Sequence, residues 1–365
     1  MRARFFSLSV TISACGSRFG FYLRHVAEVL SEGQRPAQFF TPSCVRSVMH
    51  SHPLSPHPSP LSIVLAARFA PLHRELADAC GGTPPALPKS SRRKLQKEYV
   101  DLLSRHMGLS LPPHVKGRDL APIFSADLVR RQVDDSECPG WDNLMRELES
   151  RSIGEVGWLA EHLRHLEMER SHDPRTRLPE SPLLNPATPL LPQLRLEPGE
   201  LLELLGGCEI DLLGTYSVEY GITLYYARIG LCAEALGISA FDLGLVVYIH
   251  ELAHLISHRG LDLDDCNWPT YSFNDASTYT VETIAQWYTS LAVVGRDEED
   301  AFYALLRGQS EPYTAFRVWR NEPMIREYVR MAMLEIRRCS LPDDQPRGSL
   351  FERVRQLVKF SKDYP

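Results

Sequence analysis

The sequence predicts an α+β fold that is mostly helical, with a small sheet beside one long, buried helix. Three observations predict it. Apolar residues recur at spacings of three and four along much of the chain, and a segment rich in β-branched and aromatic residues surrounds a glycine within 214–226. A helix that is apolar on nearly all sides follows at 239–258. Few strands among many helices are typical of the α+β class.

The composition is that of an ordinary soluble globular protein, with 365 residues of which 44% are hydrophobic. The net charge of −6, from 40 basic and 46 acidic residues, gives no electrostatic reason to expect a nucleic-acid partner. The eight cysteines are scattered singly, without a C-x-x-C pair, as expected for free thiols in a reducing compartment. No apolar run approaches the roughly 18 residues that span a bilayer. We therefore expect a cytoplasmic protein with no membrane partner.

The N-terminus offers an alternative location. Residues 1–12 have the outline of a signal sequence, and Ile12-Ser-Ala-Cys15 resembles a lipoprotein processing box. The apolar run is short and is broken by Ser7, Ser9 and Thr11, and the later cysteines are not spaced like a secreted disulfide framework. Export or lipidation is therefore the minor alternative to a cytoplasmic location.

Proline-rich stretches divide the chain into five regions. The first stretch, 41–92, cannot supply a continuous packing face, and the second, 173–198, has the prolines of a connector. The segments between and after them show helical periodicity. We expect a poorly ordered Pro/Ser/His-rich region at 1–92, a helical region at 93–172, a Pro-rich linker or strap at 173–198, a core at 199–300 and a C-terminal helical region at 301–365.

Local signals place the elements of the predicted core. Glycines at 221, 237 and 260 mark a turn and two helix ends, and Ser239 is a natural N-cap. We expect a helix at 199–205, one or two strands within 214–226, and helices at 227–236, from Ser239 to about 258, and from 274–277 to about 294.

The chemistry-bearing motif is His250-Glu251-Leu252-Ala253-His254, the H-E-x-x-H pattern. On a helix, residues i and i+4 lie one turn apart on nearly the same face, so both imidazoles can bind one metal ion. Glu251 can then take a proton from the metal-bound water as that water attacks a carbonyl. The surrounding helix is apolar, so these polar groups need a partner. A metal satisfies both imidazoles together, and the competing explanation is two buried histidines hydrogen-bonded to other protein groups.

Catalytic zinc usually has three protein ligands, so a third is required. His258 lies about 80° around the helix and two turns along from His250, too far to bind the same ion. The acidic loop is expected to be a solvated turn, although it could bend back. Glu282 lies on the next predicted helix, where small Ala285 permits close helix packing, and it is our preferred ligand. The candidates weighed were His258, Asp262, Asp264, Asp265 and Glu282.

Four features occur in order within 214–294: strand-like Gly221–Tyr226, Ala-Glu-Ala-Leu-Gly237, the H-E-x-x-H motif and the later glutamate. In these features the segment resembles bacterial metallopeptidases of the ImmA/IrrE type, which are gluzincin-like. The resemblance implies a zincin-like core in which His250, His254 and Glu282 hold Zn²⁺ and Glu251 is the catalytic base. Some members cleave a repressor protein, which implies limited proteolysis of a specific protein partner. No clear helix-turn-helix module accompanies the segment here, so a link to transcription does not carry over.

The expected function is therefore hydrolysis of a peptide bond in a protein or peptide substrate. In gluzincins a strand beside the catalytic helix pairs with the substrate, and we expect 222–226 to be that edge. Tyr271, Tyr279 and His258 are equal candidates for stabilising the oxyanion. Two other functions remain: a catalytically silent scaffold with the same fold and, less strongly, a metal hydrolase that acts on another substrate.

Overall fold

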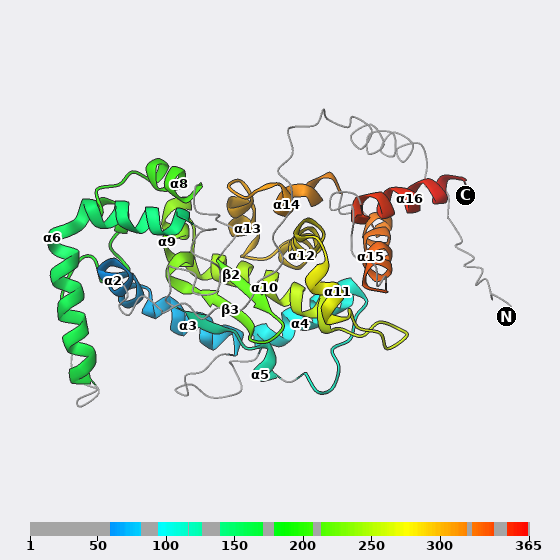
Figure 1. The fold of residues 1–365 in the computed structure, drawn as a ribbon, viewed down its shortest axis with the longest axis horizontal. Coiled ribbons are helices and arrows are strands. Elements are labelled where there is room, and N and C mark those ends of the chain that lie inside the picture. The colour runs from blue at the N-terminus through cyan, green and yellow to red at the C-terminus, as the bar shows by residue number, and fades with distance from the viewer. Residues whose placement is uncertain are drawn as a thin grey trace.

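The computed structural model describes residues 59–81, 94–115, 117–125, 139–170, 179–206, 213–319, 323–338 and 349–363. These residues are mostly helical and include a small three-stranded mixed sheet, which confirms the predicted α+β class (Figure 1). The longer helices are α2 (Pro60–Arg68), α3 (Ala70–Cys80), α4 (Lys94–Met107), α6 (Pro139–Arg170), α8 (Pro198–Gly206), α9 (Tyr226–Leu236), α10 (Ala240–Arg259), α12 (Thr278–Val293), α13 (Glu299–Leu306), α15 (Pro323–Arg338) and α16 (Ser349–Asp363). The short ones are α5 (Gly117–Leu120), α7 (Leu190–Gln193), α11 (Thr270–Asp275), α14 (Glu311–Thr314) and the 3₁₀ helix η1 (Ala315–Val318).

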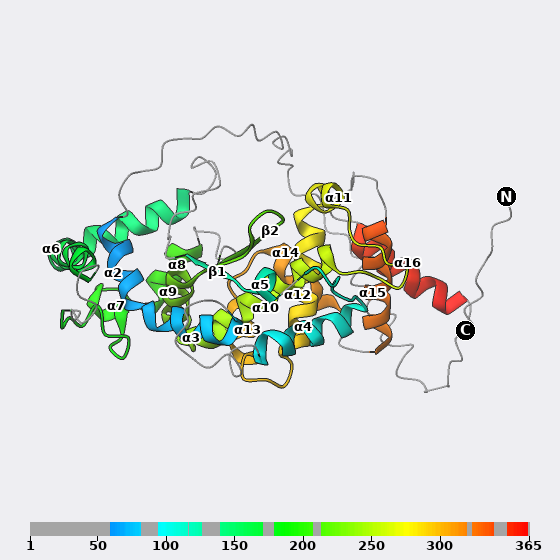
Figure 2. The same ribbon diagram turned by 90° about the horizontal axis from the view of Figure 1, so that it is seen from below.

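Helix α10 lies at the centre of the molecule (Figures 1 and 2). Every residue from Leu243 to His258 is buried, because α3, α4, α9, α12, α13 and two strands pack around it. The side chain of Ser239 caps its start by accepting a hydrogen bond from the backbone N–H of Asp242 at 3.2 Å. The helix ends at Arg259, before Gly260, as the sequence predicted.

Helix α10 is also long and apolar enough to cross a membrane by length and composition alone. Most of its apolar window, 83%, is buried inside the protein. The core helix of a soluble protein passes the same test, so this is weak evidence for a membrane span.

The sheet contains strands β1 (Ile123–Ser125), β2 (Gly214–Ser217) and β3 (Gly221–Tyr225) in the order β1-β3-β2. Strands β2 and β3 form an antiparallel hairpin, and β1 pairs with β3 in parallel. The prediction that 222–226 forms the substrate-pairing edge is therefore wrong. Strand β3 is central because β1, far away in the sequence, covers its other side, and β2 is the edge strand that contacts α10.

Helix α12 packs along α10, as the small residues of the sequence permitted. Ser277 caps it by accepting a hydrogen bond from the backbone N–H of Thr280 at 3.2 Å. Ala285 is fully buried on this helix. The short helix α11 precedes it, so the expected start within 274–277 is placed correctly, at a junction between two helices.

Residues 59–81 differ from the expectation of a poorly ordered N-terminal region, because they form α2 and α3. Helix α3 packs on α10, and the side chain of Leu76 lies so close to Gly244 that a Cβ there would be 2.6 Å from Leu76 Cδ1. The remaining parts of the region, 1–58 and 82–92, lie outside the described residues.

The described part of the expected linker, 179–197, packs against the protein as a strap. Arg68 is fully buried and holds it, donating hydrogen bonds to the carbonyl oxygens of Asn185 at 2.8 Å and Thr188 at 2.5 Å. Its charge is balanced by Glu234 at 2.8 Å. Buried leucines, including Leu190 and Leu194, anchor the strap further. The prolines here shape a packed connection instead of a free spacer.

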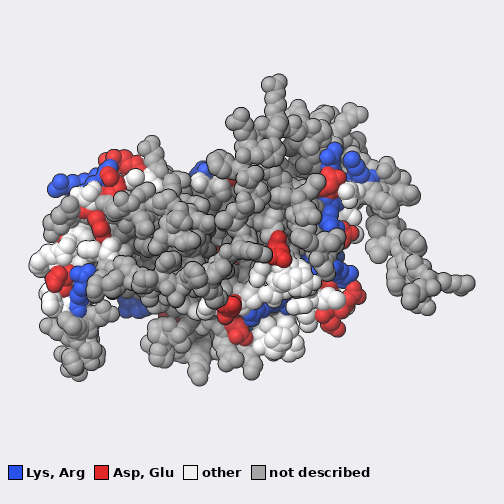
Figure 3. Space-filling view, viewed as in Figure 1, with Lys and Arg blue, Asp and Glu red and all other residues white. Residues whose placement is uncertain are grey.

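Charged side chains of both signs are interspersed at the two ends of the face in Figure 3, among the described residues that it displays. This distribution agrees with the small net charge of the sequence. The described free cysteines are Cys80, Cys232 and Cys266.

Candidate metal centre

The two histidines of the motif meet on one face of α10. Their rings lie 4.6 Å apart, centroid to centroid, and their Nε2 atoms are 3.0 Å apart. Both side chains are buried. Because residues four apart on a helix are neighbours, this proximity follows directly from the H-x-x-x-H spacing.

Glu282 reaches the same point from α12. Its Oε2 lies 3.0 Å from Nε2 of His250 and 3.3 Å from Nε2 of His254. The ligand atoms of the three residues all lie within 4.8 Å of one another, so this group can hold a metal ion. Two imidazole nitrogens and one carboxylate oxygen are a donor set found in catalytic zinc sites, and they leave a coordination position open.

The electrostatics of the three groups fit a bound cation. Burial alone would raise the pKa of the Glu282 carboxyl, but the charge of His254 and hydrogen bonds from both imidazoles hold that pKa well below its usual range. Burial lowers the pKa of His250, whereas for His254 the Glu282 charge outweighs burial and raises the pKa. The Glu282 charge therefore favours a positive charge beside it, and a bound metal cation would supply one.

Nδ1 of His250 is buried and has no hydrogen-bond partner among the described residues. Metal-binding histidines usually donate this second nitrogen to an acceptor. In the described structure, packing and the Glu282 contact orient the His250 ring instead.

Glu251 lies between the two histidines in sequence, and its side chain faces β2. Burial raises the pKa of its carboxyl to about 8, although the charge of His254 and a hydrogen bond from the backbone N–H of Tyr216 oppose the rise. Strand β2 comes very close at Gly214, where a Cβ would lie 2.7 Å from Val247 Cγ1 and 2.9 Å from Glu251 Oε1. Only glycine fits this approach without displacing the helix side chains.

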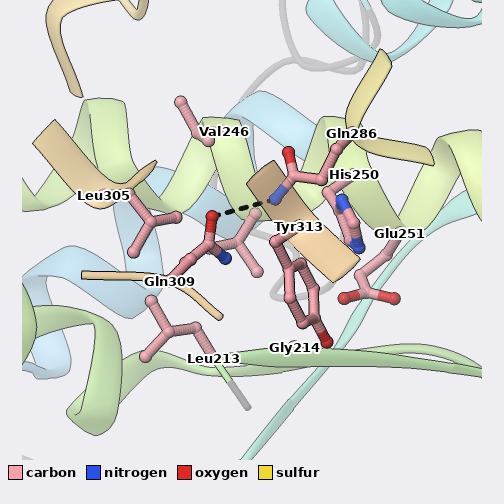
Figure 4. A pocket seen from close by; sticks show the side chains of 10 residues that line it. Leu213, Gly214, Val246, His250, Glu251, Gln286, Leu305, Gln309 and Tyr313 are labelled. Atoms are coloured by element: carbon pink, nitrogen blue, oxygen red, sulfur yellow. Dashed lines mark hydrogen bonds between the residues drawn. The ribbon is translucent and has the colours of Figure 1, made fainter. Parts of the chain in front are cut away.

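A pocket opens beside His250 and Glu251 (Figure 4). Tyr313 from α14 lines it, with its ring centroid 5.9 Å from that of His250 and its hydroxyl turned to the side where Glu251 lies. Gln286 and Gln309 line it as well. Sequence reasoning missed Tyr313 and Gln309, which belong to no motif and to no long periodic helix.

The candidates for stabilising the oxyanion lie elsewhere. His258 is buried, with Nδ1 2.8 Å from the Tyr216 hydroxyl and Nε2 3.2 Å from Thr270 Oγ1, and its ring stacks on Phe273. Burial, and after it the nearby arginines, lower the pKa of His258 to about 4. Tyr271 is 57% exposed on α11, and the ring of Tyr279 packs near Phe351. None of these three candidates lines the pocket.

The acidic loop is a turn, as the sequence predicted, but it is not solvated throughout, because Asp262 is buried. Asp262 Oδ1 accepts hydrogen bonds from the backbone N–H groups of Asp264 and Cys266, and its Oδ2 pairs with Arg338 at 2.8 Å. Asp264 pairs with the same arginine at 2.5 Å. Within the described ranges, the group of metal-ligating side chains that converges is His250, His254 and Glu282, without these aspartates.

Comparison with protein-family models, with curated proteins and with solved structures finds no significant match to this chain.

Proposed function

We propose that this protein is a zinc-dependent metallopeptidase in which His250, His254 and Glu282 hold the metal and Glu251 is the general base. The observation that carries the proposal is the convergence of two imidazole nitrogens and one carboxylate oxygen next to a buried glutamate, beside a pocket that His250 and Glu251 line. The resemblance of 214–294 to ImmA/IrrE-type peptidases supports it, and on that basis the substrate is a specific protein partner.

When bound, zinc would supply a Lewis acid for the substrate carbonyl and would lower the pKa of a water molecule. Glu251 accepts the proton from the attacking water and returns it to the leaving amine. A carboxyl group suits this exchange when its pKa lies near neutrality, and burial brings that of Glu251 to about 8 in the metal-free protein.

The substrate backbone is proposed to lie along β2. The backbone N–H of Tyr225 donates to Leu213 O, and Thr215 pairs with Thr223, so alternate residues of β2 point their backbone groups away from β3. Gly214 and Tyr216 are those residues. Because the backbone N–H of Tyr216 already donates to Glu251, a substrate strand would pair with the groups of Gly214 and with the carbonyl oxygen of Tyr216. An extended peptide could add there as a further strand. Tyr313, which lines the same pocket, is proposed to donate a hydrogen bond to the carbonyl oxygen of the cleaved bond.

Metal analysis of protein purified without chelators tests the metal site. We expect about one zinc ion per chain, lost in His250→Ala and His254→Ala, because two remaining ligands bind zinc too weakly. Wild-type protein that carries no zinc after such a purification would exclude the proposal.

The Glu251→Gln variant separates an enzyme from a silent scaffold. It should keep zinc and stability but lose nearly all cleavage of a casein or peptide-library substrate, because an amide cannot accept the proton. Glu75→Gln, at an exposed position on α3, is the matched control and should cleave like wild type. Equal turnover by wild type and Glu251→Gln would remove Glu251 from the assigned role.

A further inference from the structure

Helix α14 carries Tyr313 to the candidate metal centre, but it is too short to hold a position by itself. It has four residues, Glu311–Thr314, and an isolated helix of that length is unstable in water. It packs on α12, the helix that carries the candidate ligand Glu282. The place of the Tyr313 ring relative to the metal centre therefore depends on α12.

Two side chains of α12 hold α14 and the residues just before it. Oγ1 of Thr283 donates a hydrogen bond at 3.1 Å to the carbonyl oxygen of Pro312, which directly precedes Tyr313. Nε2 of Gln286 donates a hydrogen bond to Oε1 of Gln309 at 3.0 Å (dashed line in Figure 4). Residues three apart on a helix are neighbours, so both bonds start from the same face of α12.

The acceptor of the Thr283 hydroxyl lies outside its own helix. A threonine within a helix can bond to the carbonyl oxygen four residues before it. Thr289 does so on α12, where its Oγ1 donates to the Ala285 carbonyl oxygen at 2.8 Å. Both threonines are fully buried, but the single hydroxyl proton of Thr283 goes to α14. This bond fixes α14 relative to the helical turn that carries Glu282.

Building on the metallopeptidase function proposed above, we infer that Thr283 is a positioning residue, which holds α14 so that the Tyr313 hydroxyl reaches the carbonyl oxygen of the cleaved bond. The ring of Tyr313 lies 5.9 Å from that of His250, centroid to centroid, and its hydroxyl is turned to the side of Glu251 (Figure 4). Negative charge develops on that carbonyl oxygen in the transition state, so the donated hydrogen bond depends on a placement within about 1 Å. Thr283 acts through Tyr313 and does not contact the substrate.

A double-mutant cycle tests whether Thr283 acts through Tyr313. Values of kcat and KM are measured for cleavage of fluorescein-labelled casein by the zinc-loaded, full-length protein. Thr283→Val nearly keeps the side-chain shape and removes the hydroxyl, so it should lower kcat on the order of tenfold with little change in KM. In a Tyr313→Phe background it should change kcat by less than about twofold, because the hydroxyl that it positions is gone. Thr283→Ser keeps the donor and should have the kcat of wild type.

Thr289→Val is the matched control. It removes a hydroxyl from an equally buried threonine of the same helix, but one whose hydrogen bond stays within α12. It should lower the unfolding midpoint in urea, as Thr283→Val does, and leave kcat unchanged. Amide hydrogen exchange adds a measurement that needs neither metal nor turnover. Thr283→Val should speed exchange in 309–314, and Thr289→Val should not.

The outcomes separate this inference from the proposed function. The positioning role is overturned, and the metallopeptidase stands, if the zinc-loaded Thr283→Val variant keeps wild-type kcat or unchanged exchange in 309–314. The same holds if Thr283→Val lowers kcat equally with and without the Tyr313 hydroxyl. Protein that holds no zinc overturns both proposals. If Thr283→Val does not fold, Thr283→Cys decides the inference in the same cycle, because a small thiol is tolerated in a core and is a weak donor.

Discussion

The close approach of β2 to α10 makes Gly214→Ala a sharp test of the site. The added Cβ would lie 2.7 Å from Val247 Cγ1, about 1 Å inside the usual carbon–carbon separation, and 2.9 Å from Glu251 Oε1. Both neighbours are buried, so either the strand or the two side chains must shift. Overpacking of this kind costs about 1–3 kcal/mol of unfolding free energy. A shift of Glu251 by about 1 Å would also lower hydrolysis by up to roughly 100-fold.

Urea unfolding, zinc content and peptide cleavage measure the three effects of Gly214→Ala separately. We expect a lower unfolding midpoint and slower cleavage with zinc retained, because the ligands lie on α10 and α12. Gly157→Ala is the control: on α6 a Cβ would meet no atom within 4 Å, so it should raise stability by about 0.5–1 kcal/mol. Wild-type stability and cleavage in Gly214→Ala would refute the close approach of strand and helix.

Two further predictions concern Glu282 and the carboxylates of the acidic loop. Glu282→Gln should weaken zinc binding, measured by competition with a chelating dye, whereas Asp264→Ala should leave zinc affinity unchanged; equal losses would show that the third ligand is misassigned. Asp262→Asn should lower the unfolding free energy at pH 7 by roughly 1–3 kcal/mol, because the carboxylate loses its charge-assisted bonds to Arg338. Burial opposes ionisation of Asp262, but hydrogen bonds from the Cys266 N–H and from Arg338 keep its pKa below the usual value for Asp. The ionised carboxylate therefore stabilises the fold above that usual pKa. This stabilisation is lost as the pH falls through the lower pKa that Asp262 has in the folded protein. The difference between wild type and Asp262→Asn should therefore shrink on acidification to pH 3, and a constant difference would contradict this.

Local signals were enough to predict the helices that carry the candidate ligands. Helix α10 has a capping serine at its start, an apolar run and a glycine just past its end, and these signals act over short distances in the sequence. Helix α12 is capped by Ser277 in the same way. The i, i+4 spacing then fixes the two imidazoles on one face, so the structure brings together the residues that the motif singled out.

Features that depend on distant pairing were not predictable. The sheet order depends on β1, a strand of three residues that joins β3 in parallel and carries no signal of its partner. Tyr313 reaches the pocket from α14, a helix of only four residues, too short for periodicity to mark. The N-terminal helices were not predicted, because the Pro/Ser/His-rich composition of this region indicates poor order, whereas proline, which occurs at the start of α2 and α3, is favourable in a first helical turn.

The arrangement of the three candidate ligands also bears on the choice between a metal site and a structural cluster. A neutral imidazole carries one N–H, so a histidine that only stabilises a fold needs one acceptor for that proton and one donor for its other nitrogen. Here both Nε2 atoms face the same carboxylate oxygen and also face each other at 3.0 Å. Protons cannot satisfy all of these contacts at once. Burying ionisable groups in this state destabilises the fold unless another interaction offsets the lost hydration. A single divalent cation bound by all three side chains would supply that interaction, and this physical argument supports the proposed metal centre over a silent histidine pair.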